Sequence, residues 1–319
     1  MKLISICIPC YNEESNIEAI YNKICEVISI YKGKYDFEFI FADNDSKDLS
    51  QTIIRKLASE DKRVKGIFNT RNFGPVKSNR NSLLHAKGDA VISIVCDFQD
   101  PPELIPEFIK KWEEGNLVVC GQKTTTDERG IKKYARKLYY KIIKNMAEVN
   151  QYEQVTGFAL YDRSVIEAIR KFDNPNIALR YVLSYIGYSV ELIPYNQPCR
   201  RAGKSSYNIN RYFDFAITSL IDTSYMPIRI MTILGFLLSC FSLIAGIVYL
   251  IYKLVNWNTF AAGVAPILIF ILFFSAFILF FMGILGEYIV AISKQVNHYS
   301  SAFVKEYINF GGEDDDKEN

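Results

Sequence analysis

Residues 91–103 read VISIVCDFQDPPE, and this stretch decides how the rest of the chain is interpreted. An apolar run with the composition of a buried strand ends in an acidic loop, and a proline pair then precedes a helical pattern. Asp97 is the first charged side chain at the exit of this strand, and Gln99 and Asp100 follow it closely. Oxygen-rich clusters at the carboxyl end of a buried strand are where α/β enzymes hold a divalent metal and its phosphates. The stretch therefore predicts an α/β fold with a ligand site at the end of this strand.

Similar apolar runs recur on either side of this stretch, and the segments between them show the apolar spacing of helices. The expected strands span residues 3–8, 37–42, 64–68, 90–95 and 117–120, and the expected helices lie near residues 14–31, 47–60, 75–87 and 102–112. Such regular alternation predicts βαβ units that form a mostly parallel sheet with helices on both faces. The fold class expected for residues 1–206 is therefore α/β and Rossmann-like.

Polar residues follow three of these strands, as PCYNE at 9–13, DNDS at 43–46 and DFQD at 97–100. Ligands of open α/β sheets bind outside the carboxyl ends of the strands, so all three clusters are expected to converge on one cleft. Asp43 lies close enough to its strand to accept hydrogen bonds from ribose hydroxyls or from the edge of a base. Asp45 and Ser46 have a simpler alternative role, which is to cap the following helix. Arg71, at the end of the third strand, is a cation suited to a bidentate phosphate contact.

Two long apolar stretches follow in the last third of the chain. No charged residue occurs between positions 230 and 252, and after Lys253 none occurs until Glu287. Stretches of this length exceed the ~20 residues that a helix needs to cross the hydrocarbon of a bilayer. We therefore expect a transmembrane hairpin over residues 228–290, with spans at about 230–252 and 262–286. A pair of buried core helices is the alternative interpretation.

The charges around this hairpin predict its orientation. Lysine and arginine flank its outer ends at Arg211, Arg229, Lys294 and Lys305, whereas the loop between the spans carries Lys253 alone. Such an excess of positive charge marks the cytoplasmic side. The N-terminal apolar stretch is too short for a signal peptide, because polar and acidic residues interrupt it after about seven residues. Residues 1–206 and both termini are therefore expected on the cytoplasmic side of the cell membrane.

Two segments near the hairpin have the pattern of amphipathic helices. Residues 130–147 combine basic side chains with apolar residues at helical spacing, and residues 207–227 repeat apolar residues just before the first span. Both are expected to lie in the anionic headgroup region, with ordinary surface helices as the alternative. Residues 291–319 are expected to form a cytoplasmic helix and an acidic disordered tail. An odd count of seven cysteines in a chain facing a reducing compartment argues against a disulfide framework.

Several motifs occur in the order found in one enzyme family. They are SICIPCYNEE (5–14), FADNDSKD (41–48), TRNFG (70–74), CDFQDPPE (96–103), QVTGFALYDR (154–163), RRAGKSS (200–206) and, at the end of the apolar stretches, LGEY (285–288). With them the chain resembles, over about residues 1–310, the family 2 glycosyltransferases that charge polyprenyl phosphate with a sugar, relatives of dolichol-phosphate mannose synthase.

The resemblance implies a GT-A fold, a nucleotide-sugar donor, a Mg²⁺ or Mn²⁺ ion, an inverting transfer, a membrane lipid as acceptor and self-association. Carried over position by position, it implies that Asp97 and Gln99 hold the metal and the diphosphate. The residues implied to hold the nucleotide sugar are Pro9, Tyr11, Glu13, Asp43, Asp45, Arg71 and Asp97.

The chain departs from the family pattern at two positions. Val95 stands where family members usually carry the first aspartate of a DxD motif, so metal binding is expected to rest on Asp97, Gln99 and the diphosphate, and to be weaker. Gly157 stands where many relatives carry an aspartate proposed as a base. A phosphate monoester has its second pKa at about 6, so a polyprenyl phosphate is largely dianionic at neutral pH and needs no base.

Bringing two anions together in such a reaction requires cations. Arg200, Arg201 and Lys204 stand just before the segment that approaches the membrane, and they are expected to clamp the acceptor phosphate. The catalytic set expected is therefore Asp97, Arg200, Arg201 and Lys204, and further candidates for the acceptor phosphate are Lys123, Lys133 and Ser205. A solvated basic loop is the alternative for these cations.

The expected function is the inverting transfer of a single sugar from a nucleotide sugar, with UDP as the favoured nucleotide, to undecaprenyl phosphate at the cytoplasmic membrane face. Nucleic acid is not an expected partner. A processive polysaccharide synthase is one alternative, but such enzymes carry a QxxRW motif, absent from this sequence, and more spans. A catalytically idle nucleotide-sugar scaffold on the membrane is another; Val95 and Gly157 favour it, whereas Asp97 and the basic residues do not.

Overall fold

A computed structural model describes residues 1–125, 154–172, 179–198, 226–255, 264–296 and 302–311. The chain divides into two compact units. The first consists of Met1–Tyr140, Val149–Asn208 and His298–Asn319, and the second of Lys141–Glu148 and Ile209–Asn297. The C-terminal residues therefore belong to the same unit as the N-terminal domain, although the two apolar stretches separate them in sequence.

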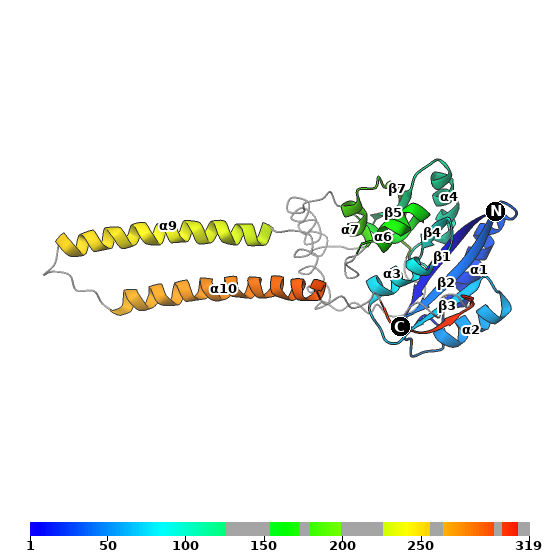
Figure 1. The fold of residues 1–319 in the computed structure, drawn as a ribbon, viewed down its shortest axis with the longest axis horizontal. Coiled ribbons are helices and arrows are strands. Elements are labelled where there is room, and N and C mark those ends of the chain that lie inside the picture. Colours follow the sequence, from blue (N-terminus) through cyan, green and yellow to red (C-terminus); the bar gives the residue numbers. More distant parts are fainter. Residues whose placement is uncertain (126–153, 173–178, 199–225, 256–263, 297–301, 312–319) are drawn as a thin grey trace. The chain divides into compact units, whose positions relative to one another are not determined.

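The first unit contains an eight-stranded sheet with the strand order β7-β5-β6-β4-β1-β2-β3-β8 (Figure 1). The strands are β1 (Lys2–Cys10), β2 (Tyr35–Asp43), β3 (Val64–Asn69), β4 (Ala90–Ser93), β5 (Val118–Thr125), β6 (Val155–Asp162), β7 (Glu191–Asn196) and β8 (Val304–Ile308). The helices are α1 (Ile17–Ile28), α2 (Ser50–Glu60), α3 (Pro75–His85), α4 (Ile105–Glu113), α6 (Arg163–Arg170) and α7 (Leu179–Ile186), with short 3-10 turns at Ser29–Tyr31 and Pro102–Leu104. The predicted α/β class is confirmed.

Parallel pairing in the middle of the sheet brings the strand exits together. β1 pairs with β2 from Lys2 opposite Tyr35 to Cys10 opposite Asp43, and it pairs with β4 on its other side. β2 in turn pairs in parallel with β3, whereas β8 and β6 are antiparallel neighbours of β3 and β4. Because β1, β2, β3 and β4 run in one direction, their carboxyl ends lie along the same edge of the sheet, as predicted.

Each face of the sheet has its own apolar core. On β1, Ile6 and Ile8 belong to the core that α1, α2 and α4 complete, whereas Cys7 belongs to the core completed by α3, α6 and α7. All three side chains are fully buried. Successive residues of a strand point to opposite faces, so a strand covered on both sides must be apolar throughout. This two-sided burial explains the continuous apolar runs of the sequence and fixes the position of the strand exits.

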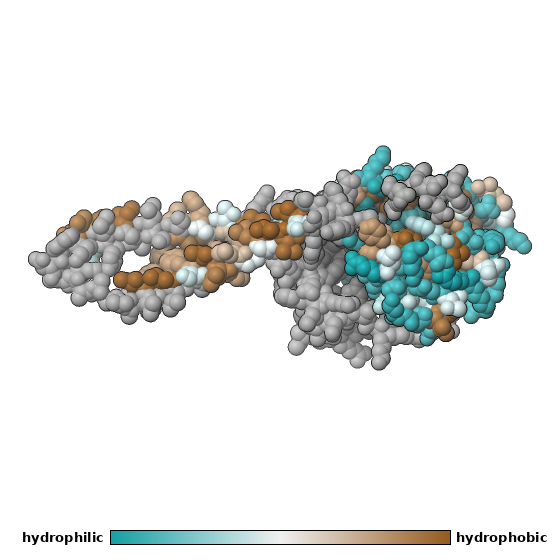
Figure 2. Space-filling model, turned by 60° about the horizontal axis from the view of Figure 1, so that its bottom comes forward, coloured by the Kyte–Doolittle hydropathy of each residue, from teal (hydrophilic) through white to brown (hydrophobic). Residues whose placement is uncertain are grey.

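The second unit contains two long apolar helices, α9 (Met226–Val255) and α10 (Val264–Val296). Large apolar side chains along both are exposed, among them Phe236 on α9 and Phe280 on α10, and Figure 2 draws brown, hydrophobic surface along these helices. Within α10, residues Phe273–Val290 are long and apolar enough to cross a membrane, judged by length and composition. A single such stretch among the described helices supports one span, and the predicted two-span hairpin stays a prediction.

Two expected element boundaries are wrong. β4 ends at Ser93 although the apolar run continues to Val95, because the Val95 N–H donates to the Asp100 carboxylate and not to a neighbouring strand. The helix expected after residue 291 ends at Val296, and Val304–Ile308 form the strand β8, whose backbone pairs with the edge of β3. The amphipathic helices expected at 130–147 and 207–227 lie outside the described residues, as does the acidic end of the chain from residue 312.

Candidate functional site at the carboxyl edge of the sheet

The backbone adopts a left-handed conformation at each of the three predicted clusters. Asn12 after β1 has a φ of 55°, Asp45 after β2 has 64°, and Phe98 after β4 has 63°. Residues other than glycine rarely take positive φ, and an aromatic residue does so less readily than asparagine or aspartate. Such strained positions cluster at functional sites, where the surrounding structure holds them. The strand exits are therefore the first place to look for ligand chemistry.

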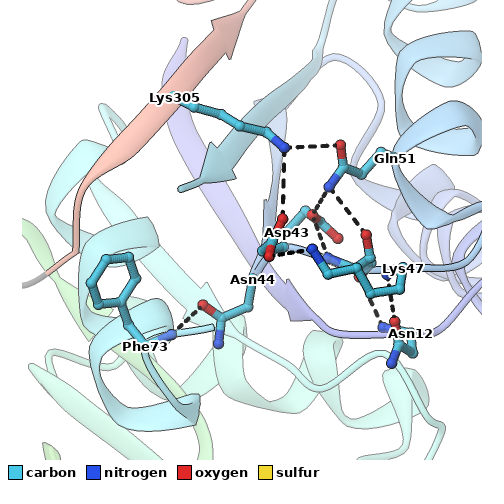
Figure 3. Close-up of polar contacts among 9 residues, drawn as sticks. Asn12, Asp43, Asn44, Lys47, Gln51, Phe73 and Lys305 are labelled. Atoms are coloured by element: carbon cyan, nitrogen blue, oxygen red, sulfur yellow. Dashed lines mark hydrogen bonds and ion pairs between the residues drawn. The ribbon is translucent and has the colours of Figure 1, made fainter. Parts of the chain in front are cut away.

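The exits of β1 and β2 are joined by hydrogen bonds between loop backbone and side chains. The Asn12 N–H donates to Ser46 Oγ at 2.8 Å, and the Lys47 N–H donates to Asn12 Oδ1 at 2.8 Å (Figure 3). One step further along, the Glu13 N–H donates to Ser50 Oγ at 2.9 Å. These reciprocal bonds make the first two predicted clusters one continuous wall.

Asp43 lies in this wall with one oxygen satisfied and the other open. Its side chain is fully buried, and its Oδ1 accepts hydrogen bonds from the Ser46 N–H at 3.1 Å and from Gln51 Nε2 at 2.7 Å. Its Oδ2 is buried too, yet it has no hydrogen-bond partner among the residues that the structure describes. Burial raises the pKa of Asp43, while the bonds from Ser46 and Gln51 and the charge of Lys305 oppose this rise. An acceptor in this state is matched to a ligand that brings a donor.

The loop after β3 is attached to the same wall through Asn44. Asn44 Oδ1 accepts from the Phe73 N–H at 3.0 Å (Figure 3). It also accepts from Asn69 Nδ2 at 3.1 Å, and Asn44 Nδ2 donates to Asn72 Oδ1 at 2.9 Å. The guanidinium of Arg71 lies over the Phe73 ring, 4.5 Å from its centroid. Arg71 is exposed at the β3 exit, at the edge where the sequence predicted a phosphate-binding cation.

The remaining nucleotide candidates differ in how far they are engaged inside the protein. Pro9 and Tyr11 are partly exposed at the β1 exit. Glu13 is buried, and its Oε2 accepts a hydrogen bond from Asn16 Nδ2 at 2.6 Å. Asp45 Oδ2 pairs with the ammonium of Lys47 at 2.6 Å. The sequence predicted all four as ligand-binding residues, and the structure gives Glu13 and Asp45 internal partners.

The exit of β4 carries a second group of carboxylates. Asp97 is 9% exposed, and its Oδ1 accepts from the Gln99 N–H at 3.1 Å. Asp100 is buried, with Oδ1 accepting from the Tyr195 hydroxyl at 2.9 Å and Oδ2 from the Val95 N–H at 3.3 Å. Burial raises the pKa of Asp100 to about 6 in spite of these bonds. Two acidic side chains thus lie close to the protein interior at this exit.

Lys123 supplies positive charge to this group. It lies on β5, opposite Tyr195 of β7 in the strand register, and it is partly buried. Burial lowers the pKa of Lys123, whereas the negative charges of Asp100 and Asp97 oppose that lowering. The sequence predicted Lys123 for the acceptor phosphate, and the structure brings it near the β4 carboxylates. The other predicted acceptor residues, Lys133, Arg200, Arg201, Lys204 and Ser205, lie outside the described residues.

The side chains at the β4 exit fit a metal that is bound together with phosphates. Asp97 and Gln99 provide hard oxygen donors, while both oxygens of Asp100 already accept hydrogen bonds. Within the described part of the chain, no three His, Cys, Asp or Glu side chains gather into a metal site. Mg²⁺ is commonly held by one or two carboxylates plus substrate phosphates, so a donor set of this size suits it.

Comparison with known families decides the classification. The family model described as glycosyl transferase family 2 matches residues 5–170, which include every strand exit described above. The chain belongs to glycosyl transferase family 2. The mostly parallel sheet is the GT-A-like fold predicted from the resemblance, and the prediction of the family is confirmed.

Relatives of this family 2 glycosyltransferase align along nearly its whole length. The bactoprenol glucosyl transferase of Shigella phage SfV is 32% identical over 304 residues, which cover 95% of this chain and 98% of the relative. An uncharacterized glycosyltransferase of Synechocystis is 30% identical over 294 residues, with 92% of both chains covered. Among solved structures, glucosyl-3-phosphoglycerate synthase of Mycobacterium tuberculosis with uridine diphosphate is 19% identical, with a TM-score of 0.48, and 69% of this chain and 79% of that one are covered.

Gly157 of this glycosyltransferase has space around its Cα atom for a side chain. A Cβ atom built there would have Asn79 Nδ2 as its nearest neighbour, at an ordinary contact distance of 3.5 Å. Asn79 Oδ1 accepts a hydrogen bond from the Ser93 hydroxyl at 3.0 Å, so Gly157 faces the end of β4. Packing therefore does not exclude a side chain at position 157, and the glycine there is not a steric requirement.

Sequence reasoning missed Gln51, Tyr195 and Lys305 as parts of this edge. Gln51 contacts Asp43 from the first turn of α2, and Tyr195 contacts Asp100 from β7. Gln51 gave no signal because a polar residue on a helix is ordinary. Tyr195 gave none because it is far from Asp100 in sequence. Lys305 was interpreted as a flanking charge of the membrane segment, and the pairing of β8 with β3 brings it to the β2 exit.

Proposed function

We propose that this protein transfers a single sugar, with inversion, from a nucleotide sugar to polyprenyl phosphate at the cytoplasmic face of the membrane. The observation that carries the proposal is the end-to-end match to a bactoprenol glucosyl transferase, which includes the catalytic unit and both apolar helices. Undecaprenyl phosphate is the proposed lipid, and a uridine nucleotide is the proposed leaving group.

The donor is proposed to lie across the exits of β2, β1 and β4. Asp43 Oδ2 would accept a hydrogen bond from the nucleoside, and Arg71 would contact phosphate from the β3 side. Asp97 and Gln99 would hold the diphosphate through a Mg²⁺ or Mn²⁺ ion, which when bound offsets the negative charge that develops on the leaving group. β2 and β4 lie on either side of β1, about 10 Å apart, a span suited to the extended nucleotide.

The acceptor supplies its own nucleophile. A phosphate monoester is largely dianionic at neutral pH, so one of its oxygens can attack the anomeric carbon without losing a proton first. The new oxygen–carbon bond forms as the bond to the diphosphate oxygen breaks, and the diphosphate takes the electron pair. Gly157 is consistent with this chemistry, because no side chain at that position is needed as a base. Arg200, Arg201 and Lys204 are proposed to hold the lipid phosphate in line.

The membrane attachment is proposed to come from α9 and α10. The stretch Phe273–Val290 supports one span, and the charge-free run over residues 230–252 supports the other. The proposed organisation is a catalytic unit from residues 1–206, interfacial helices near 130–147 and 207–227, and a hairpin over 228–290. Both termini then lie in the cytoplasm, and self-association is open to test by the mass of the detergent-solubilised protein.

A transfer assay tests the proposal. The full-length protein, purified in detergent, is mixed with Mn²⁺, undecaprenyl phosphate and a panel of radiolabelled nucleotide sugars headed by UDP-glucose. A lipid-linked monosaccharide is the expected product, and Asp97→Asn serves as the inactive control. Polymer would indicate a processive synthase. Nucleotide binding with no turnover for any sugar would indicate a scaffold and overturn the proposal.

A further inference from the structure

The strand β8 joins the catalytic sheet from the far end of the chain and is fixed there by its side chains. The carboxylate of Glu306 forms a paired contact with the Arg55 guanidinium, with Nη2 to Oε2 at 2.7 Å. The hydroxyl of Tyr307 lies 3.0 Å from His85 Nε2. Beyond the strand, Asn309 Nδ2 donates to backbone carbonyls at the ends of α2 and β3, both at 2.8 Å. These contacts set the position of the residue between Val304 and Glu306, which is Lys305.

Lys305 extends from β8 toward the exit of β2 (Figure 3). Its ammonium nitrogen lies 3.8 Å from Asp45 Oδ1 and 3.4 Å from Gln51 Oε1. Gln51 bridges onward, because its Nε2 donates to Asp43 Oδ1 at 2.7 Å. Lys305, Gln51 and Asp43 therefore form a row that ends at the buried Asp43 Oδ2, the atom with no hydrogen-bond partner among the described residues.

A purely structural ion pair does not account for this lysine. Asp45 already has the ammonium of Lys47 at 2.6 Å, so it does not need a second cation at 3.8 Å. Hydrogen bonds of nitrogen donors are typically about 2.7–3.2 Å long, and both contacts of Lys305 exceed that range. An ammonium carries three donors, and the side chain of Lys305 is 38% exposed. The lysine thus retains capacity to donate to a ligand at the edge of the site.

Lys305 and Asp43 Oδ2 offer one donor and one acceptor at this end of the site. Uracil presents an N–H group beside a carbonyl oxygen on one edge of the base, and this pair of groups matches that donor and acceptor. We propose that Lys305 is a nucleotide-binding residue that donates a hydrogen bond to a uracil carbonyl while Asp43 Oδ2 accepts from the neighbouring N–H. The inference rests on the proposed function, and it adds that the C-terminal strand, encoded after both apolar helices, completes the donor site.

The strand order supports this placement of the base. β8 and β3 lie on one side of β2, whereas β4, with Asp97 at its exit, lies on the other side of β1. A nucleotide whose diphosphate lies at Asp97 therefore directs its base toward Asp43 and Lys305.

Isothermal titration of the full-length protein in detergent tests the inference with two ligands, UDP and UMP. Lys305→Met keeps the length of the side chain and removes its donors, so the Kd for both ligands is expected to rise about tenfold. Lys47→Met is the matched control, because this lysine also pairs with Asp45 but lies further toward solvent, with 71% of its side chain exposed. Its Kd values are expected to stay within about twofold of the wild type.

Each result of the titration has one meaning. Wild-type affinity in Lys305→Met overturns the inference and leaves the proposed function standing, whereas a wild-type protein that binds no UDP removes the proposed function itself. A loss for UDP but not for UMP would assign Lys305 to the outer phosphate and overturn its contact with the base. Equal losses in Lys305→Met and Lys47→Met would mean that both lysines act through Asp45, and would overturn a direct contact of Lys305 with the base. Independently of any variant, the wild type must prefer UDP to CDP, and equal affinity would overturn the uracil contact.

Discussion

At the exit of β2, Asp43 keeps one oxygen without a hydrogen-bond partner among the described residues, whereas at the exit of β4 both oxygens of Asp100 accept hydrogen bonds. Burial raises the pKa of both carboxyls, so the difference lies in what surrounds them. Ser46 and Gln51 donate to one oxygen of Asp43, and Lys305 lies beyond Gln51. At Asp100 the neutral donors occupy both oxygens, and the charged neighbours are Asp97 and the partly buried Lys123. The β2 end is suited to receive a hydrogen-bond donor, and the β4 end is suited to receive positive charge.

The largest effect is expected from a substitution of Asp97. Asp97→Asn keeps the size of the side chain and removes the charge, so sugar transfer is expected to fall by a factor of at least about 100. Transfer to undecaprenyl phosphate is measured together with the thermal unfolding midpoint, which should stay near that of the wild type. Glu103→Gln, at a solvent-exposed carboxylate nearby, is the control and should remain active. Full activity of Asp97→Asn would remove the metal and diphosphate assignment.

A smaller loss is expected at the β2 end. Asp43→Asn turns a charged acceptor into a mixed donor and acceptor, and leaving a ligand N–H unpaired should raise the Kd for UDP by about 10- to 100-fold. Titration of UMP should give a similar loss, because the contact is with the nucleoside. If UMP bound Asp43→Asn as tightly as the wild type, Asp43 would not contact the nucleoside.

The parts of this contrast that the sequence could predict follow from local patterns. The runs of β1 to β4 are apolar because helices cover both faces of the sheet, and the helices α1 to α4 carry their apolar residues at helical spacing, so these elements could be predicted. Asp43 and Asp97 could be predicted because each is the first charged residue at the end of an apolar run, FIFA before Asp43 and VISIVC before Asp97. The parallel pairing of β2, β1 and β4 then brings Asp43 and Asp97 to the same edge of the sheet, as predicted.

The rest depends on contacts between distant segments. β7 contains Pro194, which weakens a strand pattern, and β6 contains Gly157, so neither was predicted. β8 is five residues long and carries two charged residues, and only its pairing with β3 gives Lys305 a role. No local property of Val304–Ile308 indicates that partner.

Acidification should weaken ligand binding at both ends of the site, and the contribution of Asp43 can be measured separately with UMP. Because its pKa is raised above the ordinary value, its acceptor form is complete above that raised pKa and is lost as the pH falls through it. The affinity for UMP, which lacks the second phosphate, should therefore decrease on acidification by up to about tenfold per pH unit, and Asp43→Asn should show a flatter profile. Parallel profiles for the two proteins would assign the pH dependence to another group.

The smallest expected effect concerns Val95, whose side chain is partly exposed at the β4 exit. Val95→Asp adds a carboxylate to the donors Asp97 and Gln99, so the Mn²⁺ concentration for half-maximal UDP binding should fall several-fold. Val95→Asn, of the same size but uncharged, should change it less. An unchanged Mn²⁺ requirement in Val95→Asp would mean that the metal is not held at this exit.

The most direct test is an experimental structure of the full-length protein with UDP and Mn²⁺. The nucleoside is predicted within hydrogen-bond distance of Asp43 Oδ2, with Lys305 beside the base and the diphosphate next to Asp97. A nucleotide bound away from the carboxyl edge of the sheet, or reversed with its phosphates at Asp43, would contradict the division of the site into a nucleoside end and a charge-receiving end.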